Sequence, residues 1–206
     1  MSEKAIEIGR LLRAGTTGFV VGCRAGRLEA LSFGALVRAP VEPNYIIYGL
    51  IYDIHIDDDG LVRQLVTADG VDDGIISDNR ANRNVPLEMS VLALGYQKDG
   101  RISHLLPPRP PLSLDVIYLC DPSDLCGFTA AGRFGYFRHV LRANDIPIGE
   151  LLAAHIQQSQ EAHQAVGQAD WVGRATQEII TLLRDDYAML AQVLGALADI
   201  NSFPVR

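Results

Sequence analysis

The chain has 206 residues, of which 48% are hydrophobic and 21% charged, a composition typical of a globular protein with a packed core and not of a disordered chain. Its formal net charge of −7 argues against general affinity for nucleic acids, because phosphate neutralisation by Lys and Arg dominates such binding. The sequence contains no run of about 18 apolar residues and no signal-peptide pattern at its start. We therefore expect a cytoplasmic protein.

The cysteines and the acidic residues set two further limits. Cys23, Cys120 and Cys126 are odd in number and form no Cys-x-x-Cys pair, so we expect reduced thiols and neither a disulfide framework nor a zinc site. Most of the acidity is local, since residues 51–80 contain eight aspartates against two arginines. The rest of the chain is close to neutral, and this is compatible with a basic site elsewhere on the surface.

The amino-terminal half has the pattern of a series of short strands. Gly, Pro, Asn or Asp interrupts it about every ten residues, and the runs between are rich in Val, Ile, Tyr and Leu. The expected strands are residues 8–14, 18–23, 32–38, 45–56, 87–96 and 115–119, with residues 61–66 as a further candidate hairpin partner. Many short strands without helical periods between them favour a closed barrel or a sandwich.

Two segments between these strands are predicted to be irregular. Residues 68–86 are polar, rich in turn residues and too long for a tight hairpin, so we expect an exposed, mobile loop. Residues 107–111 read PPRPP, and proline supplies no backbone donor for strand pairing. We expect an extended connector there.

The second half of the chain changes to a helical period. We expect a barrel domain at residues 1–123 and a helical domain at residues 124–206. One helix is predicted from Asp145, which can cap it, to about Gly167. A second, longer helix is predicted over residues 170–199, with Ile179 and Leu182 in its apolar stripe and an interruption at Asp186. Two such antiparallel helices form a helical hairpin, whose apolar seam either the barrel or another subunit must cover.

The barrel half resembles the HAS-barrel family, the small β-barrel at the amino ends of HerA-type DNA-translocating ATPases and of rotary ATP synthase α and β subunits. Three stretches carry the resemblance. They are IGRLLRAGTTGFVVGC (residues 8–23), YIIYGLIYDIHI (residues 45–56) and LLPPRPPLSLDVIYLCD (residues 105–121). The resemblance covers about 115 residues and implies a small antiparallel barrel that serves as an assembly element. It further implies docking to a protein partner, a HerA-type ATPase or a NurA-type nuclease.

The ATPase chemistry of that family is not expected in this chain. Those ATPases carry a G-x-x-x-x-G-K-[ST] loop after the barrel, in which a lysine reaches the nucleotide phosphates. The only lysines here are Lys4 and Lys98, and neither follows a glycine-rich loop. We expect no nucleotide cofactor, and the sequence also lacks a nucleophile elbow or a Cys/His catalytic signature.

One polar cluster leaves a metal site open as an alternative. Asp53, His55 and Asp57 alternate along a predicted strand, so their side chains are expected on one face, where two carboxylates and an imidazole could bind a divalent metal. A metal-dependent hydrolase would use these three residues. The plainer interpretation is the solvated face of a half-buried strand, and on that interpretation no metal binds.

A second cluster interleaves arginines with aromatic residues. It consists of Arg133, Phe134, Tyr136, Phe137, Arg138 and Arg142. Such a mixture is typical of protein interfaces, where Arg and aromatic residues are enriched. It also suits stacking on bases while pairing with phosphates, and the aromatics could equally join the barrel to the helices.

The sequence thus predicts a β-barrel followed by α-helices, α+β overall, that acts as a non-enzymatic adaptor. The expected partner-binding residues are the arginine and aromatic cluster together with Ile179 and Leu182, and a homo-oligomer is one expected outcome. A nucleic-acid-binding accessory protein that uses Arg133, Arg138 and Arg142 remains an alternative.

Overall fold

The computed structural model describes residues 5–24, 31–56, 60–68, 70–81 and 86–202. Seven strands form one sheet: β1 (Glu7–Ala14), β2 (Gly18–Cys23), β3 (Leu36–Glu42), β4 (Tyr45–Ile56), β5 (Leu87–Lys98), β6 (Arg101–Ser103) and β7 (Val116–Leu119). The helices within the described residues are α1 (Leu61–Thr67), α2 (Asp73–Ala81), α3 (Pro122–Ala130), α4 (Phe137–Leu141), α5 (Ile148–Ala165), α6 (Trp171–Leu182) and α7 (Tyr187–Ser202). The prediction of a barrel followed by helices is confirmed.

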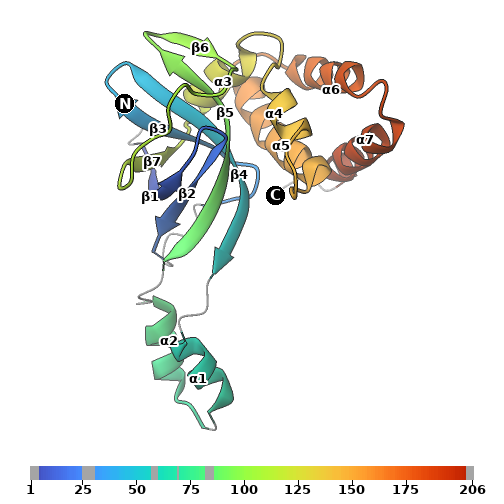
Figure 1. Ribbon diagram of the computed structural model, residues 1–206. Coiled ribbons are helices and arrows are strands. Elements are labelled where there is room, and N and C mark those ends of the chain that lie inside the picture. The colour runs from blue at the N-terminus through green and yellow to red at the C-terminus, as the bar shows by residue number, and fades with distance from the viewer. Residues whose placement is uncertain (1–4, 25–30, 57–59, 69, 82–85, 203–206) are drawn as a thin grey trace.

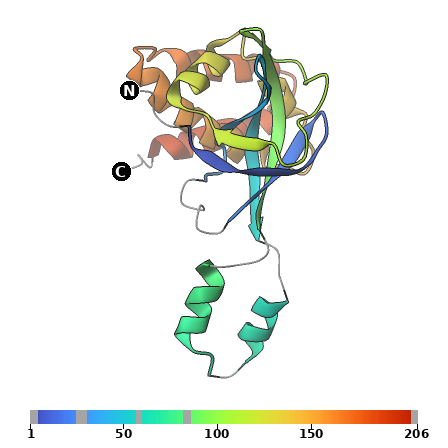
Figure 2. The same cartoon turned by 90° about the vertical axis from the view of Figure 1, so that its left-hand side faces the viewer.

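Six antiparallel strands close into a barrel (Figures 1 and 2). The sheet order is β2-β1-β7-β3-β4-β5-β6, and the additional pairing of β2 with β5 closes it, so that Phe19 lies opposite Val91. The short strand β6 extends β5 outside the closed ring. Closure satisfies the backbone donors and acceptors that an open sheet edge would expose.

The carboxy-terminal helices pack on the outside of the barrel wall made by β3, β4 and β5. Tyr48 and Leu50 of β4 join the core shared with the helices, whereas Ile47 and Ile51 point into the barrel. A strand covered on both faces needs apolar residues at successive positions, which accounts for the run YIIYGLI at residues 45–51. The Tyr48 ring stacks on Phe128 of α3 with 4.6 Å between ring centroids.

A partly buried ion pair also connects the barrel to the helices. The Arg38 guanidinium of β3 lies 2.8 Å from the Asp124 carboxylate of α3. Burial raises the pKa of Asp124, and Arg38 opposes that rise. The Asp121 side chain caps α3 by accepting a hydrogen bond from the Asp124 backbone amide at 2.8 Å.

The structure corrects the prediction for residues 61–86. The candidate strand at residues 61–66 is the helix α1, and the expected loop at residues 68–86 contains the helix α2. The apolar residues of α1, namely Leu61, Val62, Leu65 and Val66, recur at intervals of one, three and four, which is helical spacing. Together α1 and α2 form an arm beyond the ends of β4 and β5 (Figure 1).

Three further boundaries differ from the predictions. Strand β3 begins at Leu36, because residues 32–35 form a turn in which Gly34 has a φ of 82°. Helix α5 begins at Ile148 with Pro147 at its N-cap position, so Asp145 lies two residues too early to cap it. The long helix predicted over residues 170–199 is two helices, since the Asp186 carboxylate accepts a hydrogen bond from the Met189 amide at 3.0 Å and starts α7. The irregular connector at residues 107–111 is confirmed.

Candidate functional site

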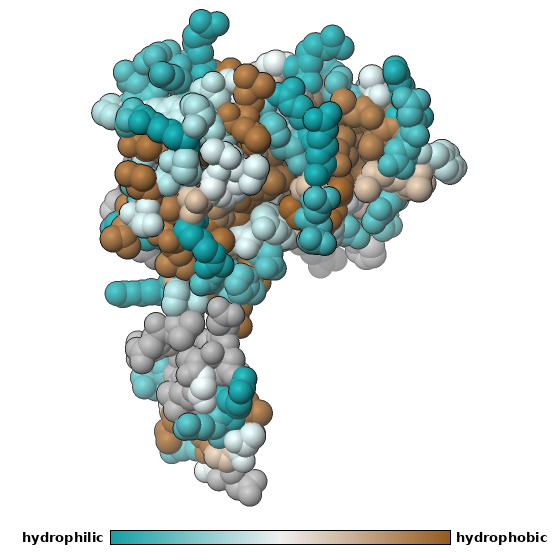
Figure 3. Space-filling model, viewed as in Figure 1, coloured by the Kyte–Doolittle hydropathy of each residue, from teal (hydrophilic) through white to brown (hydrophobic). Residues whose placement is uncertain are grey.

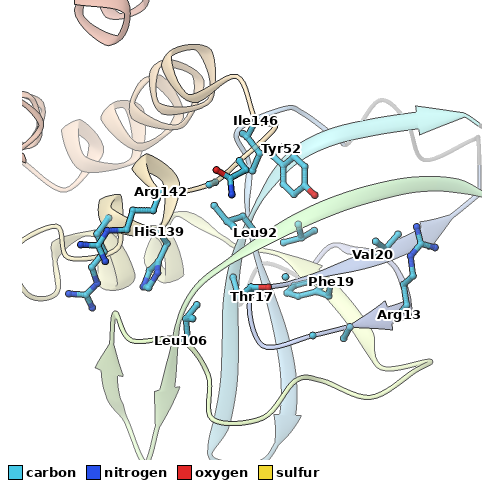
Figure 4. Close-up of a pocket in the computed structure, with 18 residues that line it drawn as sticks. Arg13, Thr17, Phe19, Val20, Tyr52, Leu92, Leu106, His139, Arg142 and Ile146 are labelled. Carbon is cyan, nitrogen blue, oxygen red and sulfur yellow. The ribbon is translucent and has the colours of Figure 1, made fainter. Parts of the chain in front are cut away.

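An open groove of about 860 Å³ lies where the barrel meets the helices (Figure 4). The turn between β1 and β2 forms one wall, β4 and β5 form the floor, and the segment from α4 to the start of α5 forms the other wall. Arg142 and His139 reach it from the helical side and Arg13 from the barrel side, with Thr17, Phe19 and Leu92 between them. We call this the junction groove.

The junction groove is basic. Arg13, Arg138 and Arg142 line it together with His139, and the described residues of its lining include no aspartate or glutamate. This charge is opposite to the formal net charge of −7 for the whole chain. A cleft lined by one sign of charge concentrates ligands of the other sign.

The three arginines differ in how they are held. The Arg13 guanidinium lies 3.0 Å from the Glu88 carboxylate, and the Arg138 Nη2 donates to the His104 carbonyl at 2.6 Å. The exposed Arg142 guanidinium has no hydrogen-bond or ion-pair partner in the part of the chain that the structure describes. Arg142 is therefore the lining cation most available to a ligand.

His139 stands between the two helical arginines as a neutral group. Its Nε2 lies 2.8 Å from the His104 carbonyl oxygen. Burial lowers the pKa of His139, and the positive charges of Arg138 and Arg142 lower it further. The imidazole therefore acts as a hydrogen-bonding group near neutral pH, while the arginines supply the charge.

The groove offers apolar surface beside these charges. Leu92, Leu106 and Ile146 contribute side chains to its lining, along with Phe19 and the half-buried Tyr52. Apolar contact area next to arginines is the mixture found at protein-binding hot spots. The groove can therefore take a ligand that carries both carboxylates and apolar side chains.

The residues of the predicted arginine and aromatic cluster separate into two groups. Phe134, Tyr136 and Phe137 are buried in the core shared by the barrel and the helices, so they join the two halves and are not available to a partner in this conformation. Arg138 and Arg142 line the junction groove. Arg133 is exposed on the other side of the segment, where it lines a second pocket of about 610 Å³ with Glu178 and Leu182.

Ile179 and Leu182 also differ from each other in exposure. Ile179 is fully buried within this chain, whereas Leu182 is 43% exposed. The seam predicted on the last helices is therefore covered internally at Ile179. Arg13, Phe19 and Tyr52 of the groove were missed, because they lie far apart in the sequence and no spacing rule connects them.

The candidate metal site is only partly within the described residues, since Asp57 lies outside them. His55 Nδ1 lies 3.1 Å from the Asp53 carboxylate, and His55 Nε2 lies 3.7 Å from the Glu88 carboxylate. Glu88 in turn pairs with Arg13. Within the described ranges, no group of three or more His, Cys, Asp or Glu side chains is arranged to hold a metal ion.

The other histidines have partners in the packed core. His104 Nε2 lies 3.0 Å from the Phe128 carbonyl, and His163 lies 2.7 Å from the Thr129 hydroxyl and stacks on Trp171. His155 pairs with the Tyr136 hydroxyl. These three side chains therefore connect the helices to one another and to the barrel.

The fold and the groove together define a small antiparallel barrel with a helical cap and a basic cleft at their junction. Comparison with known protein families found no matching family model, and comparison with curated proteins found no significant relative. None of the helices within the described residues is long and apolar enough to cross a membrane. The function is therefore inferred from the groove itself.

Proposed function

We propose that this protein is a non-enzymatic assembly module that binds an acidic segment of a protein partner in the junction groove. The observation that carries the proposal is the charge of the groove. Three arginines line it without a carboxylate among the described lining residues, in a chain whose net charge is −7. A surface of opposite sign to the rest of the molecule favours a partner of matching charge and orients it on approach.

The chemistry of arginine favours carboxylates within this groove. A guanidinium presents donors in a planar fork that pairs with both oxygens of a carboxylate. Among the described residues Arg142 has no hydrogen-bond or ion-pair partner, so there it can form such a pair without losing an existing contact. Apolar side chains of the partner would cover Leu92 and Leu106.

The partner that we propose is a HerA-type ATPase or a NurA-type nuclease, and the chain would then be an accessory of DNA-processing machinery. The support for this step is the resemblance of residues 8–23, 45–56 and 105–121 to HAS-barrels, which serve as assembly elements. The closed antiparallel barrel agrees with that resemblance at the level of architecture.

Co-purification with the HerA-type ATPase and the NurA-type nuclease of the same organism tests the proposal. We expect the wild-type chain to retain at least one of them, and Arg142→Glu to lose it. Arg184→Glu is the matched control, because Arg184 is exposed and pairs with the adjacent Asp185. Equal retention by the wild-type and Arg142→Glu chains, or retention of neither protein, contradicts the proposal.

Nucleic acid is the second candidate ligand, because Arg133 and Arg142 are both exposed and Arg138 lies between their two pockets. The burial of Phe134, Tyr136 and Phe137 disfavours it, since single-strand binding relies on aromatic rings that stack on bases. Fluorescence anisotropy with labelled single-stranded DNA over a salt series separates the two candidates. Salt-dependent binding that Arg142→Glu abolishes would favour DNA.

A further inference from the structure

The second pocket adjoins the junction groove, because Arg138 lines both of them. The His104 carbonyl oxygen fixes this boundary, since it lies 2.6 Å from Arg138 Nη2 and 2.8 Å from His139 Nε2. His104 lines the second pocket and His139 lines the groove. Figure 3 shows long hydrophilic side chains beside apolar surface where the barrel meets the helices. A segment bound in the groove can therefore continue past Arg138 into the second pocket.

The second pocket differs from the groove in its charge. Besides Arg133 and Arg138 it is lined by a carboxylate, that of Glu178 in α6. Glu178 is half-buried and Arg133 is exposed. In the part of the chain that the structure describes, neither side chain has a hydrogen-bond or ion-pair partner, the other included. The pocket is thus lined by separate charges of opposite sign.

A segment that covers the second pocket has to supply a cation for Glu178. Taking a carboxylate out of water without a cation costs free energy, and an acidic residue placed against Glu178 would add repulsion between like charges. A lysine or arginine of the partner removes both costs. Ile102 and the 43% exposed Leu182 line the same pocket, and they offer apolar surface to the aliphatic stem of such a side chain.

We propose that the acidic segment bound in the junction groove also carries a basic residue, which pairs with Glu178 in the second pocket. This inference rests on the proposed function of the groove and adds a residue that determines specificity. Arg142 selects for a carboxylate, and Glu178 selects for a cation beside it. A uniformly acidic ligand, such as a nucleic acid, lacks that cation and is disfavoured by Glu178.

Selection of peptides from a random library displayed on phage tests the proposal without a known partner. The immobilised full-length chains are the wild type, Arg142→Glu and Glu178→Gln. Glu161→Gln is the matched control, because Glu161 is an exposed residue of α5 that lines neither the groove nor the second pocket. Circular dichroism verifies that each variant is folded.

We expect the wild-type and Glu161→Gln chains to enrich peptides in which acidic residues are accompanied by a lysine or arginine at a fixed spacing. Glu178→Gln should keep the preference for acidic residues and lose the basic position. For one selected peptide, fluorescence anisotropy then compares its affinity before and after its basic residue is replaced with alanine. The replacement should weaken binding to the wild type at least about fivefold, and binding to Glu178→Gln less than about twofold.

Two results would overturn the inference and leave the proposed function intact. They are acidic peptides without a basic position, and a basic position that Glu178→Gln still selects. Failure of the proposed function gives a different result. A wild type that enriches no acidic peptide, or an Arg142→Glu chain that enriches the same peptides as the wild type, contradicts the role of the groove and this inference with it.

Discussion

The Tyr136 hydroxyl lies 3.2 Å from His155 Nε2, and both side chains are fully buried. Tyr136 precedes α4 at the edge of the segment that supplies the groove arginines, and His155 is in the middle of α5. Their rings meet edge to face with 5.6 Å between centroids. This pair therefore holds the helical wall of the groove against the longest helix of the cap.

Replacing Tyr136 with Phe should lower the free energy of unfolding by about 1–2 kcal/mol, because the change leaves a buried imidazole nitrogen without its hydrogen-bond partner. Tyr187→Phe is the control, since Tyr187 is 82% exposed. Urea unfolding followed by circular dichroism measures both. Equal midpoints for the two variants would show that the pair contributes nothing to stability.

Acidification should destabilise the protein through His155. Burial lowers the pKa of His155 from 6.5 to about 4. Between these values the unfolded chain binds a proton that the folded chain does not, so the stability present above pH 6.5 is lost as the pH falls toward 4. The loss from this residue approaches about 3 kcal/mol. His104 and His163 act in the same direction, because burial also lowers the pKa of each.

Unfolding free energies measured from pH 7.5 to pH 4.5 check this expectation. The unfolding free energy should change less steeply with pH in His155→Gln, because glutamine cannot take up the proton. A slope unchanged by that substitution would place the pH dependence elsewhere in the molecule.

Gly34 is predicted to be intolerant of a side chain. Its φ of 82° lies in the left-handed region, and a Cβ there would lie 2.7 Å from the Ala154 Cβ and 2.9 Å from the His155 backbone nitrogen. Gly34→Ala should cost about 2–4 kcal/mol, from backbone strain and overlap together. Gly100→Ala is the matched control, because Gly100 has a φ of 77° with no atom near its Cβ position, and it should cost only about 1 kcal/mol. Thermal unfolding of the two variants measures the difference.

Ile179 and Leu182 should respond differently to the same substitution. Ile179→Asp places a charge in a fully buried position and should destabilise the chain by at least about 3 kcal/mol. Leu182→Asp changes a residue that is 43% exposed and should cost less than about 1 kcal/mol. Chemical unfolding distinguishes them. A large effect at Leu182 would indicate that an unrecognised contact covers the second pocket.

The strands were the most predictable part of the fold. β2 and β4 match the predicted residues 18–23 and 45–56, because β-branched and aromatic runs bounded by turn residues specify strands locally. The helix α3 was missed although Asp121, Pro122 and Asp124 form a helix start, with a cap, a proline in the first turn and an early carboxylate. In the arm, α1 was predicted as a strand and α2 as part of a loop, because helices of seven and nine residues are too short to show a clear helical period.

The candidate site was only half predictable. Arg138 and Arg142 were identified from a local pattern. Arg13 lines the groove only because the pairing of β2 with β5 closes the barrel, which no local pattern predicts. The aromatic residues between the arginines were assigned to the interface because composition alone does not distinguish a surface aromatic from a core one. Tertiary packing decides that, and it buries Phe134, Tyr136 and Phe137.

Site-specific photo-crosslinking from the groove tests the central claim most directly. A photoreactive residue is placed in living cells at Leu106, which lines the groove, and at Leu112, which is exposed but does not line it. The crosslinked peptides are then sequenced. We predict that Leu106 crosslinks to an acidic polypeptide segment, from a HerA-type ATPase or a NurA-type nuclease, and that Arg142→Glu removes this product while Leu112 never yields it. Crosslinks from Leu106 to nucleic acid, or products that Arg142→Glu leaves unchanged, would contradict the account.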